Sequence, residues 1–167
     1  GTSDEPLTVS QSLPGIDGVV IVTTPQEVAL LDSRKSINFA KTISVPVLGV
    51  VENMSGYTLR GTSTPNSSIS VMGPGGVPIE CQSDGEGKWE ITLDVFKSGG
   101  GEEASKEMGV PFLGALPFDP GIVRGGDDGV HRIIAEPEGE TARAFESIVK
   151  MVEEQLDKGS QRTLRII

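Results

Sequence analysis

Two apolar runs, Val19–Val22 and Val47–Val51, constrain the fold of this chain more than any other feature of its sequence. Neither run alternates with polar residues, and such a run is typical of a strand buried on both faces of a parallel sheet. Residues 26–41 lie between them and predict an amphipathic helix. The apolar face of that helix carries Leu30, Ile37 and Ala40. A strand, a helix and a second strand with short connections form a βαβ unit with parallel strands.

The start of that helix and the elements that follow it are also predicted. Thr24 is expected to be the N-cap, and Pro25 the first helical residue. Residues 99–109 predict a short helix with a glycine-rich entry, which Gly109 ends. Residues 110–120 contain a third short buried strand that runs into a proline-bounded loop.

The segment 141–159 predicts a closing helix, because its apolar residues follow the i, i+3, i+4, i+7, i+11 spacing of one helical face. These residues are Phe145, Ile148, Val149, Val152 and Leu156. Gly159 is expected to end the helix. The predicted fold class is α/β, with a mostly parallel sheet flanked by helices.

Between residues 58 and 96 the apolar residues alternate with polar ones at a period of two. This alternation predicts a small antiparallel β insertion, a hairpin-like element within a single domain that spans residues 1–167. Its apolar positions are Ile69, Val71, Val77, Ile79, Cys81, Trp89, Ile91, Leu93 and Val95. Because Cys81 alternates with Val77 and Ile79, it is expected to be a small buried hydrophobic residue. The Ser-, Thr- and Asn-rich segment at its start, 58–68, has almost no apolar residues to bury and is expected to be irregular.

Charge and cysteine content exclude several classes of function. The chain has 167 residues and a net charge of −10, which argues against a nucleic-acid partner. Its one cysteine, Cys81, and one histidine, His131, cannot form an intrachain disulfide or a zinc site of the usual kind. No apolar run approaches the roughly 20 residues of a membrane span. A cytoplasmic location, or an organelle matrix after processing, is expected.

No phosphate-binding or catalytic motif is found in the sequence. The pattern GxxxxGK[ST] does not occur, since the Gly-Lys pair at 87–88 is followed by Trp89. No residue is assigned a catalytic role. The glycine-rich helix entry at 98–101 has two interpretations, an anion site at a helix N-terminus and a hinge that leaves the insertion, and the hinge is favoured.

Open parallel α/β sheets bind ligands at the carboxyl ends of their strands. Such ends are expected at 23–25, 52–54 and 116–119. Asn53 has an amide that donates and accepts hydrogen bonds and so matches the edge of a purine base. It is equally well interpreted as a turn residue that bonds its own backbone. Pro117 and Phe118 provide an apolar wall for a ring.

Several long segments, in a fixed order, carry a resemblance to a known family. They are GTSDEPLTVSQ, DGVVIVTTPQEVALLDSRKSINFAK, VPVLGVVENMSGY, SGGGEEASKEMGVPFLGALPFDP and GGDDG. On these segments the chain resembles the C-terminal part of the Mrp/NBP35 family of P-loop ATPases, relatives of MinD and ParA that serve in iron–sulfur cluster assembly. The likeness covers most of the chain apart from residues 58–95 and the last few residues.

The resemblance implies an ATP-binding protein, with Mg²⁺, that works as a homodimer or as a heterodimer with a related ATPase. It also implies iron–sulfur client proteins as partners. Its nucleotide-binding residues map onto Asn53 and Met54 at the adenine base, onto the base-pocket loop Pro117, Phe118, Asp119 and Pro120, and onto Gly1 and Thr2 near the γ-phosphate.

The chain departs from the family in two ways. The family's phosphate loop and its magnesium-linked Asp have no counterpart in this sequence, so no ATP hydrolysis is expected from this polypeptide alone. Iron–sulfur members also carry a C-x-x-C pair shortly after the turn that matches 52–55, whereas here Tyr57-Thr58-Leu59-Arg60 follows. Two copies of Cys81 fall short of four thiolates, so a bridging [4Fe–4S] cluster is not expected.

Three functions remain open from the sequence. The first is the adenine-side half of a nucleotide site in an iron–sulfur carrier. The second is a cluster-free scaffold that docks a partner through the insertion, near Trp89. The third, weaker, is a MinD- or ParA-like positioning ATPase with a membrane-touching tail at 158–167, for which a frayed terminus is the favoured alternative.

Overall fold

A three-stranded parallel sheet lies at the centre of the protein. The computed structural model describes residues 8–9, 12–13 and 15–164. The strands β1 (Val19–Thr23), β2 (Val47–Glu52) and β7 (Phe112–Ala115) pair in the order β1-β2-β7. Both pairings are parallel, which confirms the predicted βαβ unit and the α/β fold class.

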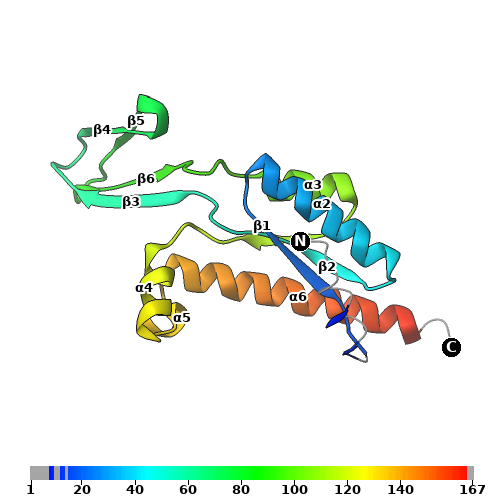
Figure 1. The fold of residues 1–167 in the computed structure, drawn as a ribbon. Helices are drawn as coiled ribbons and strands as arrows, with labels where there is room; N and C mark the ends of the chain where they lie inside the picture. Colours follow the sequence, from blue (N-terminus) through cyan, green and yellow to red (C-terminus); the bar gives the residue numbers. More distant parts are fainter. Residues whose placement is uncertain (1–7, 10–11, 14, 165–167) are drawn as a thin grey trace.

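Helices cover both faces of this sheet (Figure 1). The helices α2 (Glu27–Thr42) and α3 (Gly100–Met108) pack on one face, and the long helix α6 (Glu140–Leu164) packs on the other. On the α6 side, the buried residues Val51, Leu113, Leu116 and Ile148 form one apolar cluster. The central strand β2 therefore has core on both faces, as its unbroken apolar run predicts. The same prediction is wrong for β1, because α6 packs chiefly against β2 and β7 and leaves Val20 and Val22 37% and 62% exposed.

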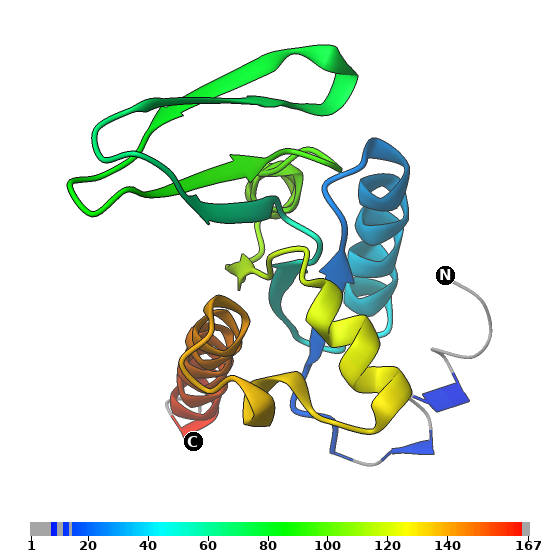
Figure 2. The same cartoon turned by 90° about the vertical axis from the view of Figure 1, so that its left-hand side faces the viewer.

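The segment 57–96 forms an antiparallel extension that projects from the sheet and its helices, and we call it the β-arm (Figure 1). Its base is the pair β3 (Tyr57–Thr62) and β6 (Lys88–Leu93). Its outer part is the pair β4 (Ser68–Met72) and β5 (Pro78–Gln82), joined by the short 3₁₀ helix η1 (Pro74–Gly76). In Figure 2 the outer ribbon, β4 and β5, lies above the base of the arm, β3 and β6.

The predicted antiparallel insertion is thus confirmed, but the expectation of an irregular segment at 58–68 is wrong for its first part. Tyr57–Thr62 is a strand, because it pairs over its full length with Lys88–Leu93. Local sequence could not reveal it, since the stabilising partner is about 30 residues away along the chain. Gly61 in this strand makes room for the Trp89 ring, which lies where a Cβ would be.

Helix boundaries account for the other differences from the sequence predictions. The N-cap of α2 is Gln26, two residues later than Thr24, and Gln26 makes no side-chain cap bond. α6 continues through Gly159 to Leu164, because a single glycine weakens a long helix without having to end it. Val149, expected on the buried face of α6, is 51% exposed. Cys81, expected to be buried, is half-buried.

Two α-helices of the described part of the chain differ from the sequence analysis, which does not predict them. They are α4 (Pro120–Asp128) and α5 (Arg132–Ala135), which follow the third strand. Within the described part of the chain, no helix is both long and apolar enough to cross a membrane.

Candidate functional site

The turn after β2 and the loop after β7 lie side by side, joined by backbone hydrogen bonds. Leu116 N–H donates to the Glu52 carbonyl (2.7 Å), and Ser55 N–H donates to the Leu116 carbonyl (2.9 Å). Phe118 N–H donates to the Gly56 carbonyl (2.8 Å). β2 and β7 are neighbouring parallel strands, so both segments lie at the carboxyl edge of the sheet, where ligands of such folds bind.

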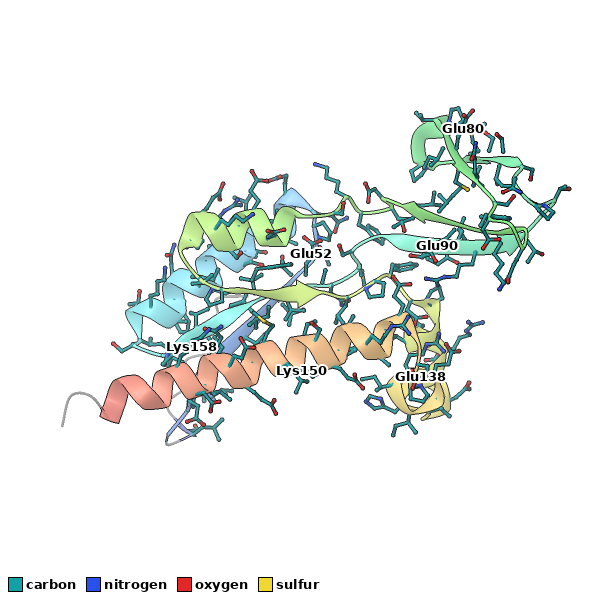
Figure 3. All side chains as sticks on the ribbon, turned by 180° about the vertical axis from the view of Figure 1, so that it is seen from behind. Glu52, Glu80, Glu90, Glu138, Lys150 and Lys158 are labelled. Atoms are coloured by element: carbon teal, nitrogen blue, oxygen red, sulfur yellow. The ribbon has the colours of Figure 1, made fainter. Side chains whose placement is uncertain are left out.

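Glu52 fixes this edge of the sheet from within the core. It is 1% exposed and lies between α3 and the sheet (Figure 3). One carboxylate oxygen accepts hydrogen bonds from Ser55 Oγ (2.6 Å) and from Gly99 N (2.9 Å), and the other accepts from Gly101 N (2.6 Å). The carboxylate thus caps the N-terminus of α3, where the helix dipole favours a negative charge.

This contact bears on the anion-site interpretation of the glycine-rich entry at 98–101. The helix N-terminus holds an anion, as one interpretation predicts, but the anion is the protein's own Glu52. The favoured hinge is not needed to explain the glycines, because a Cβ at Gly101 would lie 3.0 Å from the Glu52 Cβ and a Cβ at Gly100 would lie 2.8 Å from Leu30 Cδ1.

Asn53 begins the turn that follows Glu52. Its Oδ1 accepts a hydrogen bond from Met54 N (2.9 Å), and Met54 has a left-handed backbone with φ of 59°. This is the geometry of the turn-residue interpretation. The side-chain NH₂ of Asn53 donates to no residue in the part of the chain that the structure describes, so half of the amide remains available. Met54 is 37% exposed.

The side chain of Asn53 lines a hollow of about 310 Å³ between the end of β1 and the start of α2. Its lining is partly apolar, from Ile21, Val22 and Ala29, and partly polar, from Thr23, Thr24, Asp32, Ser33 and Ser36.

The loop Pro117–Pro120 lines a second, larger cleft of about 680 Å³ between the base of the β-arm and the start of α6. Asn53 is not among the residues that line this cleft. The structure therefore brings the predicted base-contacting segments together through their backbones, while Asn53 and the loop Pro117–Pro120 line two separate hollows. Glu90 and Glu138 stand on opposite walls of the larger cleft (Figure 3).

Asp119 is the best-connected residue of this loop. Its Oδ1 accepts from Gly121 N (2.7 Å) and caps α4, and its Oδ2 accepts from Arg132 Nε (2.7 Å) and Thr141 Oγ1 (2.6 Å). Burial alone would raise the pKa of the Asp119 carboxyl, but the hydrogen bonds from Thr141, Arg132 and Gly121 together hold this pKa below its ordinary value. Asp119 therefore ties the loop to α4, α5 and α6.

Sequence reasoning missed Arg132, Thr141 and the capping role of Glu52. The pair Asp119-Pro120 is a recognisable helix start, with an N-cap Asp before a first-turn Pro, and could have revealed α4. Arg132 and Thr141 gave no such signal, because they lie 13 and 22 residues beyond the carboxylate that they bind. Gly1 and Thr2 lie outside the described residues.

No side-chain cluster suited to a metal ion occurs among the described residues. His131 is exposed at the N-cap of α5, and Cys81 stands on the outer ribbon of the β-arm.

Comparisons with known proteins agree on one family. The family model described as ParA, NUBPL iron-transfer P-loop NTPase, matches residues 1–83 and 78–153. The chain is 37% identical over 157 residues to the iron–sulfur cluster carrier protein of Methanocaldococcus jannaschii, covering 94% of this chain and 44% of that protein. It is 40% identical over 152 residues to the iron–sulfur cluster carrier protein of Synechocystis sp., covering 91% and 35%. The chain thus spans less than half the length of these relatives.

Among solved structures, the cell division ATPase MinD of Pyrococcus furiosus has the same fold. The TM-score is 0.53 at 22% sequence identity, over 83% of this chain and 43% of that one. This likeness confirms the predicted P-loop NTPase-like architecture.

Replacing Glu52 should destabilise the protein strongly. Glu52→Ala leaves Ser55 Oγ and two α3 amides without their acceptor, so we expect the free energy of unfolding to fall by about 3 kcal/mol. Glu52→Gln keeps one acceptor oxygen and should cost about half as much. Urea unfolding measures both, with exposed Glu154→Ala as a control that changes stability by less than about 0.5 kcal/mol. A loss for Glu52→Ala as small as the control's would contradict the capping role.

The Asp119 network predicts a pH-dependent contribution to stability. A carboxyl whose pKa is lower in the folded state stabilises the fold above its unfolded pKa, about 4, and loses this contribution as pH falls through the folded pKa. Asp119→Asn should therefore cost about 1–3 kcal/mol at pH 7, and the gap to the unsubstituted protein should close below about pH 4. Urea unfolding at a series of pH values tests this. A gap that stays constant with pH would show that the charge of Asp119 plays no part.

Proposed function

The chain belongs to the NUBPL iron-transfer P-loop NTPase family, and from this we propose that it supplies the adenine-facing half of an ATP site in an iron–sulfur cluster carrier. The curated relatives are named iron–sulfur cluster carrier proteins, which supports this role. The phosphate-binding half is proposed to come from a segment outside these 167 residues.

The observation that carries the proposal is the joined turn and loop at the carboxyl ends of β2 and β7. Both segments that the family resemblance assigns to the base, Asn53–Met54 and Pro117–Pro120, lie there and are hydrogen-bonded through Ser55–Leu116 and Phe118–Gly56. The unused NH₂ of Asn53 suits an acceptor nitrogen of a purine, and Pro117 and Phe118 suit its ring.

The residues present fit the base end of a nucleotide and not its triphosphate end. The N-terminus of α3, the glycine-rich helix start of the chain, is occupied by Glu52, so its amides cannot hold a phosphate. GxxxxGK[ST] is absent from the sequence, and with it the residues that would hold Mg²⁺ in a P-loop protein. We therefore propose that this chain alone does not hydrolyse ATP.

An exposed apolar face marks where the phosphate-binding half would pack. Val22 on β1 is 62% exposed, and Val28 and Leu31 on α2 are 76% and 56% exposed. Among the described residues, β1 pairs with β2 alone, so its other edge is open to a further strand. An apolar surface next to an open parallel strand suits the strand and helix of a neighbouring α/β segment.

The proposal can be tested in a hybrid that joins this chain to the N-terminal segment of a family member carrying GxxxxGK[ST]. We expect the hybrid to bind ATP and Asn53→Ala to weaken that binding by about tenfold through the loss of hydrogen bonds to the base. Binding of tripolyphosphate, which has no base, should not change. Isothermal titration calorimetry measures both constants.

The exposed helix residue Asn38 provides a matched control, since Asn38→Ala removes the same group away from the site. If the hybrid binds ATP no more tightly than tripolyphosphate, and Asn53→Ala changes neither constant, the adenine-facing role is wrong.

We propose that two copies of this chain do not form a four-thiolate site for the iron–sulfur cluster, and that the cluster binds elsewhere. Cys81 is the chain's one cysteine, and it stands half-buried on β5. After anaerobic reconstitution with iron and sulfide, we expect less than about one cluster per ten chains, because four thiolates hold a [4Fe–4S] cluster. Stoichiometric iron and sulfide, lost in Cys81→Ser, would contradict this expectation.

A second candidate, a scaffold that docks a partner through the β-arm, rests on the exposure of the arm's outer part. Met72 is 69% exposed and Val77 is 63% exposed at the end of the outer ribbon. The positioning-ATPase alternative has less support, since the MinD likeness concerns the fold alone and residues 165–167 of the tail lie outside the described part.

A further inference from the structure

An aromatic cluster connects the β-arm to the loop after β7. The Phe118 ring lies edge-on to Tyr57, with centroids 5.7 Å apart and planes at 85°, and edge-on to Phe96, at 5.7 Å and 65°. Tyr57 is the first residue of β3, and Phe96 lies three residues beyond the end of β6. The two legs of the β-arm, β3 and the segment from β6 to Phe96, therefore both contact one side chain of the loop Pro117–Pro120.

Polar contacts close a ring around the same cleft. Arg60 on β3 donates to Glu90 on β6 (2.7 Å) and to Glu140 at the start of α6 (2.7 Å). The next residue of α6, Thr141, donates to Asp119, which follows Phe118. The path runs from the arm to α6, from α6 to the loop, and from the loop through Phe118 back to the arm.

We propose that the base of the β-arm is a working part of the nucleotide site, in which Tyr57 and Phe96 are positioning residues that hold Phe118 against the adenine ring. This inference rests on the proposed function, because it takes the loop Pro117–Pro120 to line the base pocket. It assigns the arm a role in nucleotide recognition besides any docking of partners.

The physical basis is preorganisation of the loop. Phe118 is half-buried, and its contacts with Tyr57 and Phe96 restrict its rotamers before a ligand arrives. Edge-to-face pairs of this kind contribute beyond the area that they bury. A wall that is already ordered costs the ligand less entropy on binding, so affinity falls when the ordering contacts are removed.

Thermodynamic linkage gives the contact a second consequence. If the arm holds the loop in its binding geometry, a bound base must hold the legs of the arm by the same coupling free energy. Nucleotide should therefore slow local opening of β3 and β6, while the outer ribbon, which does not touch Phe118, should be unaffected.

The test uses the hybrid introduced above, with ATP and tripolyphosphate as probes. The double variant Tyr57→Leu/Phe96→Leu keeps apolar bulk but removes the ring edges, and we expect it to weaken ATP binding about tenfold and to leave tripolyphosphate binding unchanged. Phe118→Leu should weaken ATP similarly, and the double variant should add no further loss in that background, because both act through one ring. Met72→Ala, an apolar truncation on the exposed outer ribbon of the arm, is the control and should have no effect.

Hydrogen exchange of the unsubstituted hybrid provides a measurement that needs no variant to fold. ATP should slow exchange at 57–62 and 88–93 more than tripolyphosphate does, with no difference at 68–82. The inference is overturned if ATP and tripolyphosphate protect the legs equally, or if the double variant binds ATP normally while Asn53→Ala does not. Normal ATP binding by both variants would instead overturn the proposed function.

Discussion

The buried carboxylate of Glu52 is the interaction on which the candidate site depends. An unpaired charge in the core would cost several kcal/mol, so a strand that ends in a buried glutamate needs donors close by. The first amides of α3 supply them at the end of the helix where the dipole is favourable. Because the same carboxylate accepts from Ser55, the end of β2, the turn that holds Asn53 and the start of α3 are fixed relative to one another.

The elements predicted best from the sequence are those in which the spacing of the element's own apolar residues shows which face is buried. The apolar runs of β1 and β2 and the spacing of α6 predict the type and location of these elements, because each contributes at least one face to the core. The run of β1 does not reveal that one of its faces, at Val20 and Val22, is exposed. β3 and the Asp119 network could not be predicted in this way. The partners of Thr58 and Asp119 lie tens of residues away, and no local pattern encodes a contact that exists only after the chain has folded. Gly100 and Gly101 belong to both groups: their run is visible in the sequence, but its cause, the close approach of Leu30 and Glu52, is not.

In the candidate site, the segments proposed to contact the base were predicted from a family resemblance and not from chemistry. From its chemistry alone, Asn53 is interpreted equally well as a turn residue and as a base contact. The structure shows why the two interpretations are compatible: the Oδ1 of Asn53 bonds the Met54 amide and shapes the turn, while its NH₂ stays available. A residue can satisfy its local backbone with one half of its amide and present the other half to a ligand.

The position of the β-arm follows from the same geometry. An insertion of about 40 residues between β2 and α3 leaves the sheet register intact only if its two ends lie close together. The six-residue pairing of β3 with β6 holds the two ends together. The place to which they return is the carboxyl edge of the sheet, four residues after Asn53. An arm inserted there cannot be independent of the loop after β7, because Phe118 N–H already bonds the Gly56 carbonyl and the Phe118 ring is held by the two legs. A change in the legs therefore reaches the loop through one ring and one hydrogen bond, without needing to pass through the core.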